Sequence, residues 1–139
     1  MDLTRRTTLA LGLGGMAAAA LPSQAEAAAL EAAVARFTGG AAPGEGGITL
    51  TAPEIAENGN TVPVAVSAPG AVAIALFAGG NPEAEVATFT FGPAAGSQTA
   101  ATRIRLARTQ DVLAVARMAD GRFVRTSAMV KVTIGGCGG

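Results

Sequence analysis

The sequence predicts an all-β sandwich, preceded by a short helix and followed by a glycine-rich tail. From Ile48 onward, short runs of β-branched residues are separated by turn residues about every ten positions, the spacing of an antiparallel sandwich. Several runs alternate apolar and polar residues, as half-buried strands do. The 139 residues allow one domain, and 50% hydrophobic residues are sufficient for its core.

Residues 1–25 have the three parts of an export signal. Arg5 and Arg6 form a charged segment, residues 9–21 are moderately apolar, and the letters SQA at 23–25 give the small-x-small pattern for cleavage. The paired arginines resemble a twin-arginine (Tat) signal, which predicts export of the folded protein to the periplasm. An uncleaved anchor is the alternative, but the apolar stretch is shorter than the roughly 20 residues of a membrane span. Cleavage after Ala25 or Ala27 remains open.

A helix followed by a loop is expected over residues 26–47. The segment from 26 to 37 is rich in alanine, and Leu30, Val34 and Phe37 lie on one helical stripe. The letters TGG that follow are typical of a helix end, and AAPGEGG reads as a loop.

Seven strands are expected in the domain from 48 to 134. They are Ile48–Leu50, Thr61–Ser67, Ala71–Phe77, Glu85–Phe91, Ala100–Leu106, Val112–Met118 and Arg122–Ile134, the last with a candidate break near Ser127. Between the last two, Asp120-Gly121 suits a type I′ turn, whose two central residues need positive φ. This arrangement indicates an immunoglobulin-like sandwich, although the chain has neither a tryptophan nor an intrachain disulfide.

Two strands show which side chains face the core. Ile104 and Leu106 are expected to point inward, with the neighbouring arginines outward. In the last strand the expected inward set is Val130, Val132 and Ile134, so that order should extend to Ile134.

Composition excludes several kinds of chemistry. Without histidine, imidazole acid–base catalysis and histidine ligation of metals are impossible. One cysteine cannot form a structural zinc site, and the ten acidic residues show no calcium-binding spacing. A net charge of +0 argues against nucleic-acid binding. The chain is therefore expected to have no catalytic residues, no metal site and no cofactor.

The only cysteine, Cys137, lies between two glycine pairs, Gly135-Gly136 and Gly138-Gly139. Glycine has no side chain and reaches both halves of φ space, so residues 135–139 are expected to form a thin, flexible arm. Three extended residues carry the thiol about 10 Å beyond the last strand. No basic residue on the arm would activate the thiol, so its chemistry must come from an enzyme that receives it.

Two other interpretations of the tail exist. It is either a frayed terminus without function or part of a thiol–disulfide enzyme. The second lacks the required Cys-x-x-Cys pair. In an exported protein, a single cysteine indicates an intermolecular bond or a reactive role.

Four segments together resemble the SoxY family, the carrier subunits of the periplasmic sulfur-oxidation system. They are VKVTIGGCGG at the end of the chain, ATRIRLARTQDVLAVA ending at Ala116, APEIAENGNTVPV from Ala52 to Val64, and the export signal with Arg5 and Arg6. The resemblance covers essentially the whole chain after the signal, and the terminal pentapeptide is its specific part. The loop GGNPEAEVATF departs from the family pattern around its Asn-Pro.

The resemblance implies a non-catalytic sulfur carrier that pairs with the small β protein SoxZ. Cys137 would carry S-thiosulfonate, sulfonate and persulfide groups between enzymes, and the four glycines beside it would form the arm. The implied enzymes are the haem thiosulfate-joining enzyme SoxAX, the sulfate hydrolase SoxB and, in some organisms, the sulfane dehydrogenase SoxCD. The resemblance leaves the downstream enzymes, the SoxZ contacts and an interchain disulfide of Cys137 undecided.

The alternative function is a periplasmic binding module for a small sulfur oxyanion, with an incidental tail. It would need several of six arginines to converge on one anion site: Arg103, Arg105, Arg108, Arg117, Arg122 and Arg125. An ordinary solvated surface explains the same residues, because exposed strand positions are commonly charged.

Overall fold

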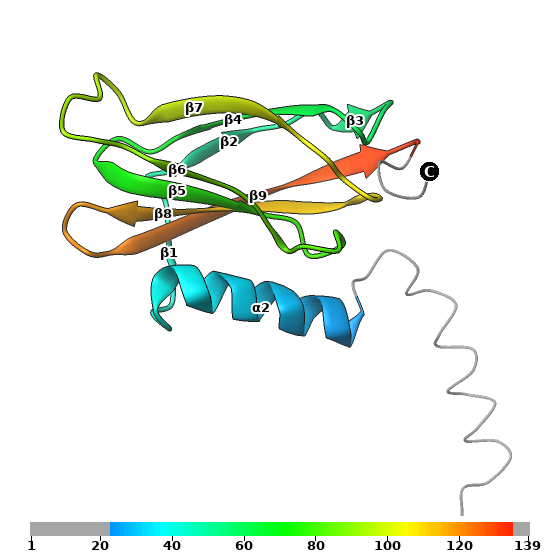
Figure 1. Ribbon diagram of the computed structural model, residues 1–139, viewed down its shortest axis with the longest axis horizontal. Helices are drawn as coiled ribbons and strands as arrows, with labels where there is room; N and C mark the ends of the chain where they lie inside the picture. The colour runs from blue at the N-terminus through cyan, green and yellow to red at the C-terminus, as the bar shows by residue number, and fades with distance from the viewer. Residues whose placement is uncertain (1–22, 135–139) are drawn as a thin grey trace, which may run out of the picture.

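The computed structural model describes residues 23–134; residues 1–22 of the predicted leader 1–25 and the predicted arm 135–139 lie outside this range. Within the described range, the structure has one helix and nine strands. They are arranged in three layers (Figure 1). Helix α2 (Gln24–Thr38) lies against a six-stranded sheet, and a three-stranded sheet covers the other face of that sheet. The all-β, immunoglobulin-like sandwich with a short N-terminal helix is confirmed.

Seven of the strands correspond to the predicted ones. They are β2 (Thr49–Thr51), β4 (Val62–Ser67), β5 (Ala71–Phe77), β6 (Glu85–Thr90), β7 (Thr99–Ile104), β8 (Gln110–Met118) and β9 (Phe123–Val132). The large sheet has the order β1-β9-β8-β5-β6, with β3 also pairing with β9, and the small sheet has the order β2-β4-β7. The predicted break near Ser127 is wrong, because β9 pairs with β8 without interruption from Phe123 to Val130.

Two short strands have no counterpart in the prediction. They are β1 (Gly44–Glu45) and β3 (Ile55–Ala56), and both run parallel to β9. Each has two residues, too few to show an alternating pattern. They are strands only because β9, a long partner, provides the hydrogen bonds.

Helix α2 is capped at both ends. The Ser23 hydroxyl accepts a hydrogen bond from the Glu26 amide at 3.1 Å, and Gly39 ends the helix in the left-handed conformation with φ 71°. The helix begins two residues before the predicted start at Glu26, so cleavage after Ala25 would remove this cap. No helix within residues 23–134 is long and apolar enough to cross a membrane.

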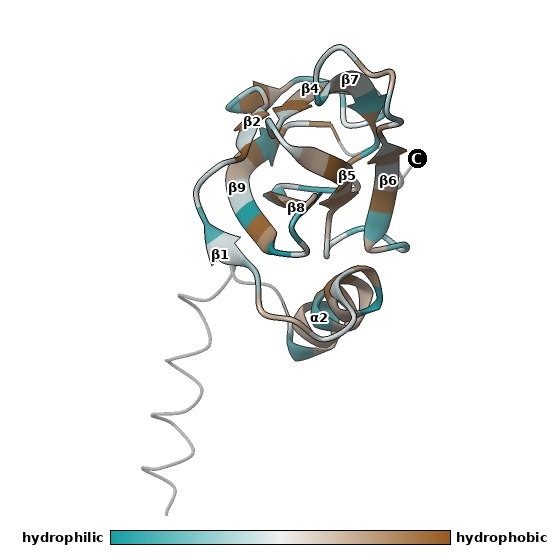
Figure 2. Cartoon of the chain, turned by 90° about the vertical axis from the view of Figure 1, so that its left-hand side faces the viewer, coloured by the Kyte–Doolittle hydropathy of each residue, from teal (hydrophilic) through white to brown (hydrophobic). Residues whose placement is uncertain are grey.

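The central strands are buried on both faces. Ile74 and Leu76 of β5 pack in the cluster toward the small sheet, whereas Ala75 and Phe77 pack in the cluster beside α2. Figure 2 shows α2 on the side of β5 and β8 that faces away from β2, β4 and β7. The helical stripe Leu30, Val34 and Phe37 packs there as predicted, with the rings of Phe37 and Phe77 6.2 Å apart in an edge-to-face arrangement. Helix α2 therefore functions as a third layer of the core.

The hairpin between β8 and β9 differs from the predicted type I′ turn. The Met118 amide donates to the Arg122 carbonyl at 2.8 Å, which closes a three-residue loop. Gly121 has φ 90°, whereas Asp120 keeps a negative φ because its carboxylate accepts the Arg122 amide at 3.0 Å. This is a turn with one left-handed glycine, which a longer hairpin loop requires.

Candidate functional site

Cys137 and the arm glycines Gly135, Gly136, Gly138 and Gly139 lie outside the described residues, so the structure shows the base of the arm rather than the thiol. The arm follows Ile134, at the end of the sandwich where β9 stops (Figure 1). The inward positions Ile104, Leu106 and Val130 are buried as predicted. Ile134 is not: 65% of it is exposed, because the strand ends at Val132.

On one side, Thr109 holds the end of β9. Its hydroxyl oxygen lies 2.8 Å from the amide of Val132, which donates to it, and 3.4 Å from the carbonyl of Val132. Thr109 lies in the loop between β7 and β8. One exposed side chain therefore bonds both backbone groups of the last strand residue.

On the other side, the segment around β3 holds the same strand end. The amides of Lys131 and Thr133 donate to the carbonyls of Glu54 and Ala56 at 2.9 and 3.1 Å. The carbonyl of Ile134 accepts the amide of Gly59 at 2.8 Å. Backbone bonds therefore continue past the end of β9 to the last described residue.

The loop that carries Thr109 is itself fixed by Asn81. The Asn81 amide group donates to the Arg105 carbonyl at 2.6 Å, and its oxygen accepts from the Ala107 amide at 2.9 Å. The same oxygen accepts from Gln110, whose own oxygen accepts the Gly80 amide at 2.8 Å. The loop of Asn81 thus bonds the loop that carries Thr109, and Thr109 in turn bonds the end of β9.

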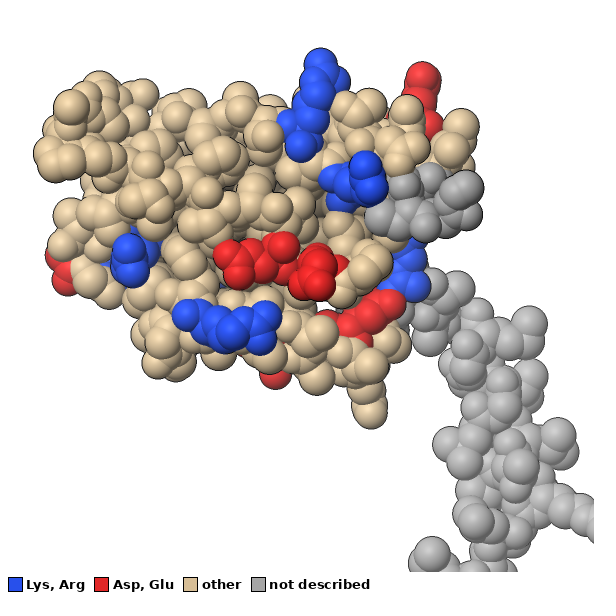
Figure 3. All heavy atoms as spheres, viewed as in Figure 1, with Lys and Arg blue, Asp and Glu red and all other residues tan. Residues whose placement is uncertain are grey.

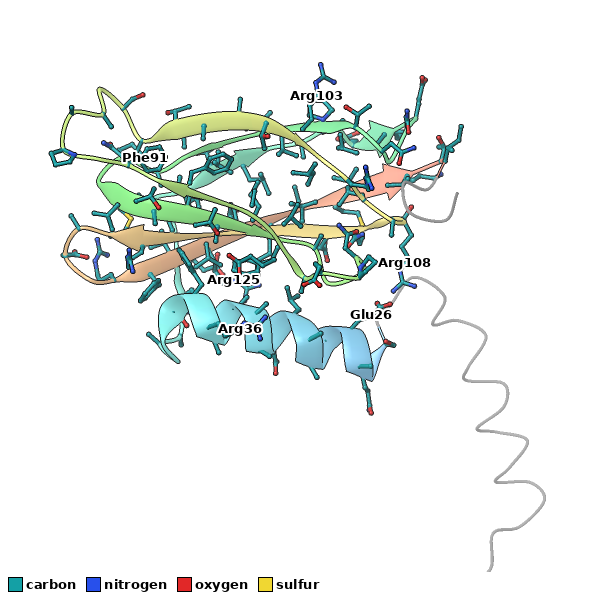
Figure 4. All side chains as sticks on the ribbon, in the orientation of Figure 1. Glu26, Arg36, Phe91, Arg103, Arg108 and Arg125 are labelled. Atoms are coloured by element: carbon teal, nitrogen blue, oxygen red, sulfur yellow. The ribbon has the colours of Figure 1, made fainter. Side chains whose placement is uncertain are left out.

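Helix α2 reaches the same end of the molecule. Arg108, next to Thr109, forms an ion pair with Glu26 in the first helical turn, as Figure 4 shows. Both side chains are partly exposed, so this pair contributes little stability by itself. It places the start of α2 and the loop that carries Thr109 side by side.

A groove of about 1060 Å³ runs between α2 and the outer faces of β8 and β9. Leu30 and Val34 line one wall, and Leu113 and Met129 line the other. One end lies at residues 40–43, after the helix, and the other lies at Arg108 and its neighbours. The groove therefore reaches the end of the sandwich from which the arm starts.

The six arginines do not form one anion site. Arg103 lies on β7, Arg108 pairs with Glu26, and Arg122 pairs with Asp120 in the hairpin at the opposite end. Basic side chains on the face in Figure 3 form separate spots rather than one patch. Residues 23–134 also contain no cluster of three acidic, histidine or cysteine side chains able to hold a metal.

Three residues of this end were not singled out from the sequence: Asn81, Thr109 and Gln110. Asn81 lies in the loop that begins GGNP, and its partners lie 24 to 29 residues away along the chain. Thr109 and Gln110 follow a predicted strand and have ordinary polar character. Only the pairing of the strands brings these side chains together.

The position of the arm on this fold leads to a comparison with known proteins. A family profile described as "Sulfur oxidation protein SoxY" matches residues 34–137. The chain belongs to the SoxY family. The SoxY match covers most of the sandwich and extends to Cys137, the only cysteine.

Solved structures agree. The sulfur carrier protein SoxY from Chlorobium limicola f thiosulfatophilum is 35% identical, with a TM-score of 0.69 over 78% of this chain and 95% of that one. A superoxide reductase (neelaredoxin) from Ignicoccus hospitalis is 17% identical, with a TM-score of 0.55 over 63% of this chain and 80% of that one. At this identity the second match concerns the fold alone. Curated protein sequences gave no match.

Proposed function

We propose that this SoxY family member is a non-catalytic sulfur carrier and that Cys137 is its attachment site. The observation that carries the proposal is the family match, which ends at Cys137, together with a solved relative named as a sulfur carrier. The base of the arm supports it, because hydrogen bonds on both sides of β9 give the arm a fixed starting point.

The proposed chemistry takes place on the thiol and is performed by other enzymes. A haem enzyme removes two electrons as the Cys137 thiolate joins the outer sulfur of thiosulfate, which gives Cys–S–S–SO₃⁻. Water then releases sulfate and two protons and leaves the persulfide Cys–S–S⁻. In organisms with a sulfane dehydrogenase, three waters and the loss of six electrons and six protons give Cys–S–SO₃⁻, from which hydrolysis releases a second sulfate and the free thiol.

The body contributes position rather than reactivity. With no histidine in the sequence, it has no imidazole to act as a general base. Gly135 and Gly136 on one side and Gly138 and Gly139 on the other give Cys137 freedom to turn within different active sites. The expected partners are SoxZ as a stable second subunit and SoxAX, SoxB and SoxCD as transient ones, with no nucleic acid and no stable membrane insertion.

A single substitution separates the carrier from the alternative, an oxyanion-binding module. Cys137→Ser should abolish thiosulfate oxidation in a system reconstituted from the partner and the Sox enzymes. Arg103→Gln serves as the control and should retain activity. Undiminished oxidation by Cys137→Ser would support a ligand site in the sandwich instead.

Export through the Tat pathway to the periplasm is also a proposal, based on Arg5 and Arg6. Replacing both arginines with lysine should leave the precursor in the cytoplasm. The mass of the mature chain from the periplasm would then locate the cut. Cleavage after either Ala25 or Ala27 would remove the Ser23 cap of α2, at a cost of about 1 kcal/mol.

A further inference from the structure

The backbone ladder between β8 and β9 stops before β9 does. Its last pair joins Gln110 with Val130, although β9 continues to Val132. At this point the Thr109 side chain replaces the missing backbone partner, with its oxygen 2.8 Å from the Val132 amide. A side-chain hydroxyl therefore extends the sheet by the two residues that lead to the arm.

The opposite edge of β9 is bonded at alternate residues. Lys131 and Thr133 donate to the segment around β3, and Ile134 accepts from Gly59. Thr109 supplies the bonds of the residue between them, Val132. Without the hydroxyl, only one edge of the strand end would be held.

Thr109 is held rigidly enough for this role. Asn81 bonds the backbone of the same loop at Arg105 and Ala107, and Gln110, the next residue, bonds both Asn81 and Gly80. Two loops distant in sequence, at residues 80–81 and 105–110, are thus bonded to each other on both sides of Thr109. An exposed threonine on a free loop would have no fixed position from which to hold a strand.

We propose that Thr109 is a positioning residue for Cys137: its hydroxyl fixes the end of β9 and thereby the point from which the sulfur-carrying arm starts. This inference rests on the proposed carrier function. A loosely held base would spread the thiol over a larger volume and lower its effective concentration at an enzyme's entrance. Thr109 takes no part in the sulfur chemistry.

The test compares Thr109→Val, which keeps the shape but lacks the hydroxyl, with Thr109→Ser, which restores it. Thr99→Val is the matched control, since Thr99 is an exposed threonine bonded to Ser67 on the small sheet. Hydrogen exchange by NMR on the carrier with its partner should show the Val132 amide exchanging about fivefold faster in Thr109→Val. Thr109→Ser and Thr99→Val should leave this rate within about twofold of the parent, because both variants keep a hydroxyl at position 109 to accept from Val132.

Two further measurements concern the arm. A nitroxide attached to Cys137, the only thiol, should show a broader range of orientations in Thr109→Val. With the thiosulfate-joining enzyme, KM for the carrier should rise about twofold at unchanged kcat, because access changes and chemistry does not.

Unchanged exchange at Val132, or an unchanged KM despite faster exchange, would overturn the positioning role. A lower kcat at unchanged KM would also overturn it, since that result would place Thr109 in the reaction itself. The exchange rate at Val132 does not depend on whether Cys137 is the attachment site, and Cys137→Ser tests the attachment site separately.

Discussion

The two ends of the sandwich are built differently. At the end that bears the arm, the side chains of Asn81, Thr109 and Gln110 bond loops that are 23 to 30 residues apart in the chain. At the opposite end, the side chains of the β8–β9 hairpin make only local bonds, between Asp120 and Arg122, and a long-range side-chain bond joins Gln98 to Gly70, 28 residues away.

This difference indicates which end of the sandwich holds the chain in a more closely defined position. A hairpin that only reverses the chain is satisfied by its own turn residues. In the proposed carrier, the end that bears the arm must hold a short tether in one place, and contacts between separate loops would provide this. The polar residues at the arm end are therefore interpreted as support for the arm, although none of them can perform sulfur chemistry.

The largest effect is expected for Asn81→Ala. It removes bonds to Arg105, Ala107 and Gln110 and should lower the free energy of unfolding by about 2 kcal/mol. Gln98→Ala at the opposite end removes one exposed bond of 3.2 Å and should cost about 0.5 kcal/mol. Urea denaturation of both variants measures the difference. Equal losses would mean that the two ends are equally constrained.

An intermediate effect is expected on the arm itself. Gly136→Val adds a β-branched side chain that thickens the arm and restricts φ, so sulfur transfer should slow by about tenfold. The melting temperature should remain nearly unchanged, because the substitution lies beyond the residues that hold β9. A large fall in melting temperature would show that the arm packs on the body, contrary to this account.

The smallest effect is expected at the β8–β9 hairpin. The hydrogen bond from the Arg122 amide, followed by that from its side chain, holds the pKa of Asp120 below its usual value. A lowered pKa stabilises the folded hairpin above the ordinary titration range, and this contribution is lost as pH falls through the folded pKa. The Arg122 amide resonance should shift with that titration and should not shift in Asp120→Asn. Any change in sulfur transfer would contradict the independence of the two ends.

Much of the fold could be predicted, because β-branched runs between turn residues locate the strands and alternation shows which side chains face the core. The bounds of β5 were predicted to the residue, and Ile104, Leu106 and Val130 face the core as the alternation requires. The prediction that Ile134 faces the core was wrong, because its side chain is exposed. Alternation predicts the buried face only while the strand continues, and β9 ends at Val132. The type I′ turn failed because the Asp-Gly pair does not fix the length of its loop.

Of the candidate site, only the proposed reactive group can be read from the sequence. A single thiol among glycines is visible in the sequence, and it directed attention to Cys137. The residues that support the arm are not visible, because Thr109 and Asn81 are ordinary polar residues until strand pairing brings them to the end of β9. Their role depends on contacts across more than 20 residues of chain.

The most direct measurement is the mass of the intact carrier after incubation with thiosulfate and the thiosulfate-joining enzyme. The account predicts an added thiosulfate group, with peptide mapping that locates it on Cys137. Full loading of the Cys137→Ser variant, or an adduct on any other residue, would contradict it.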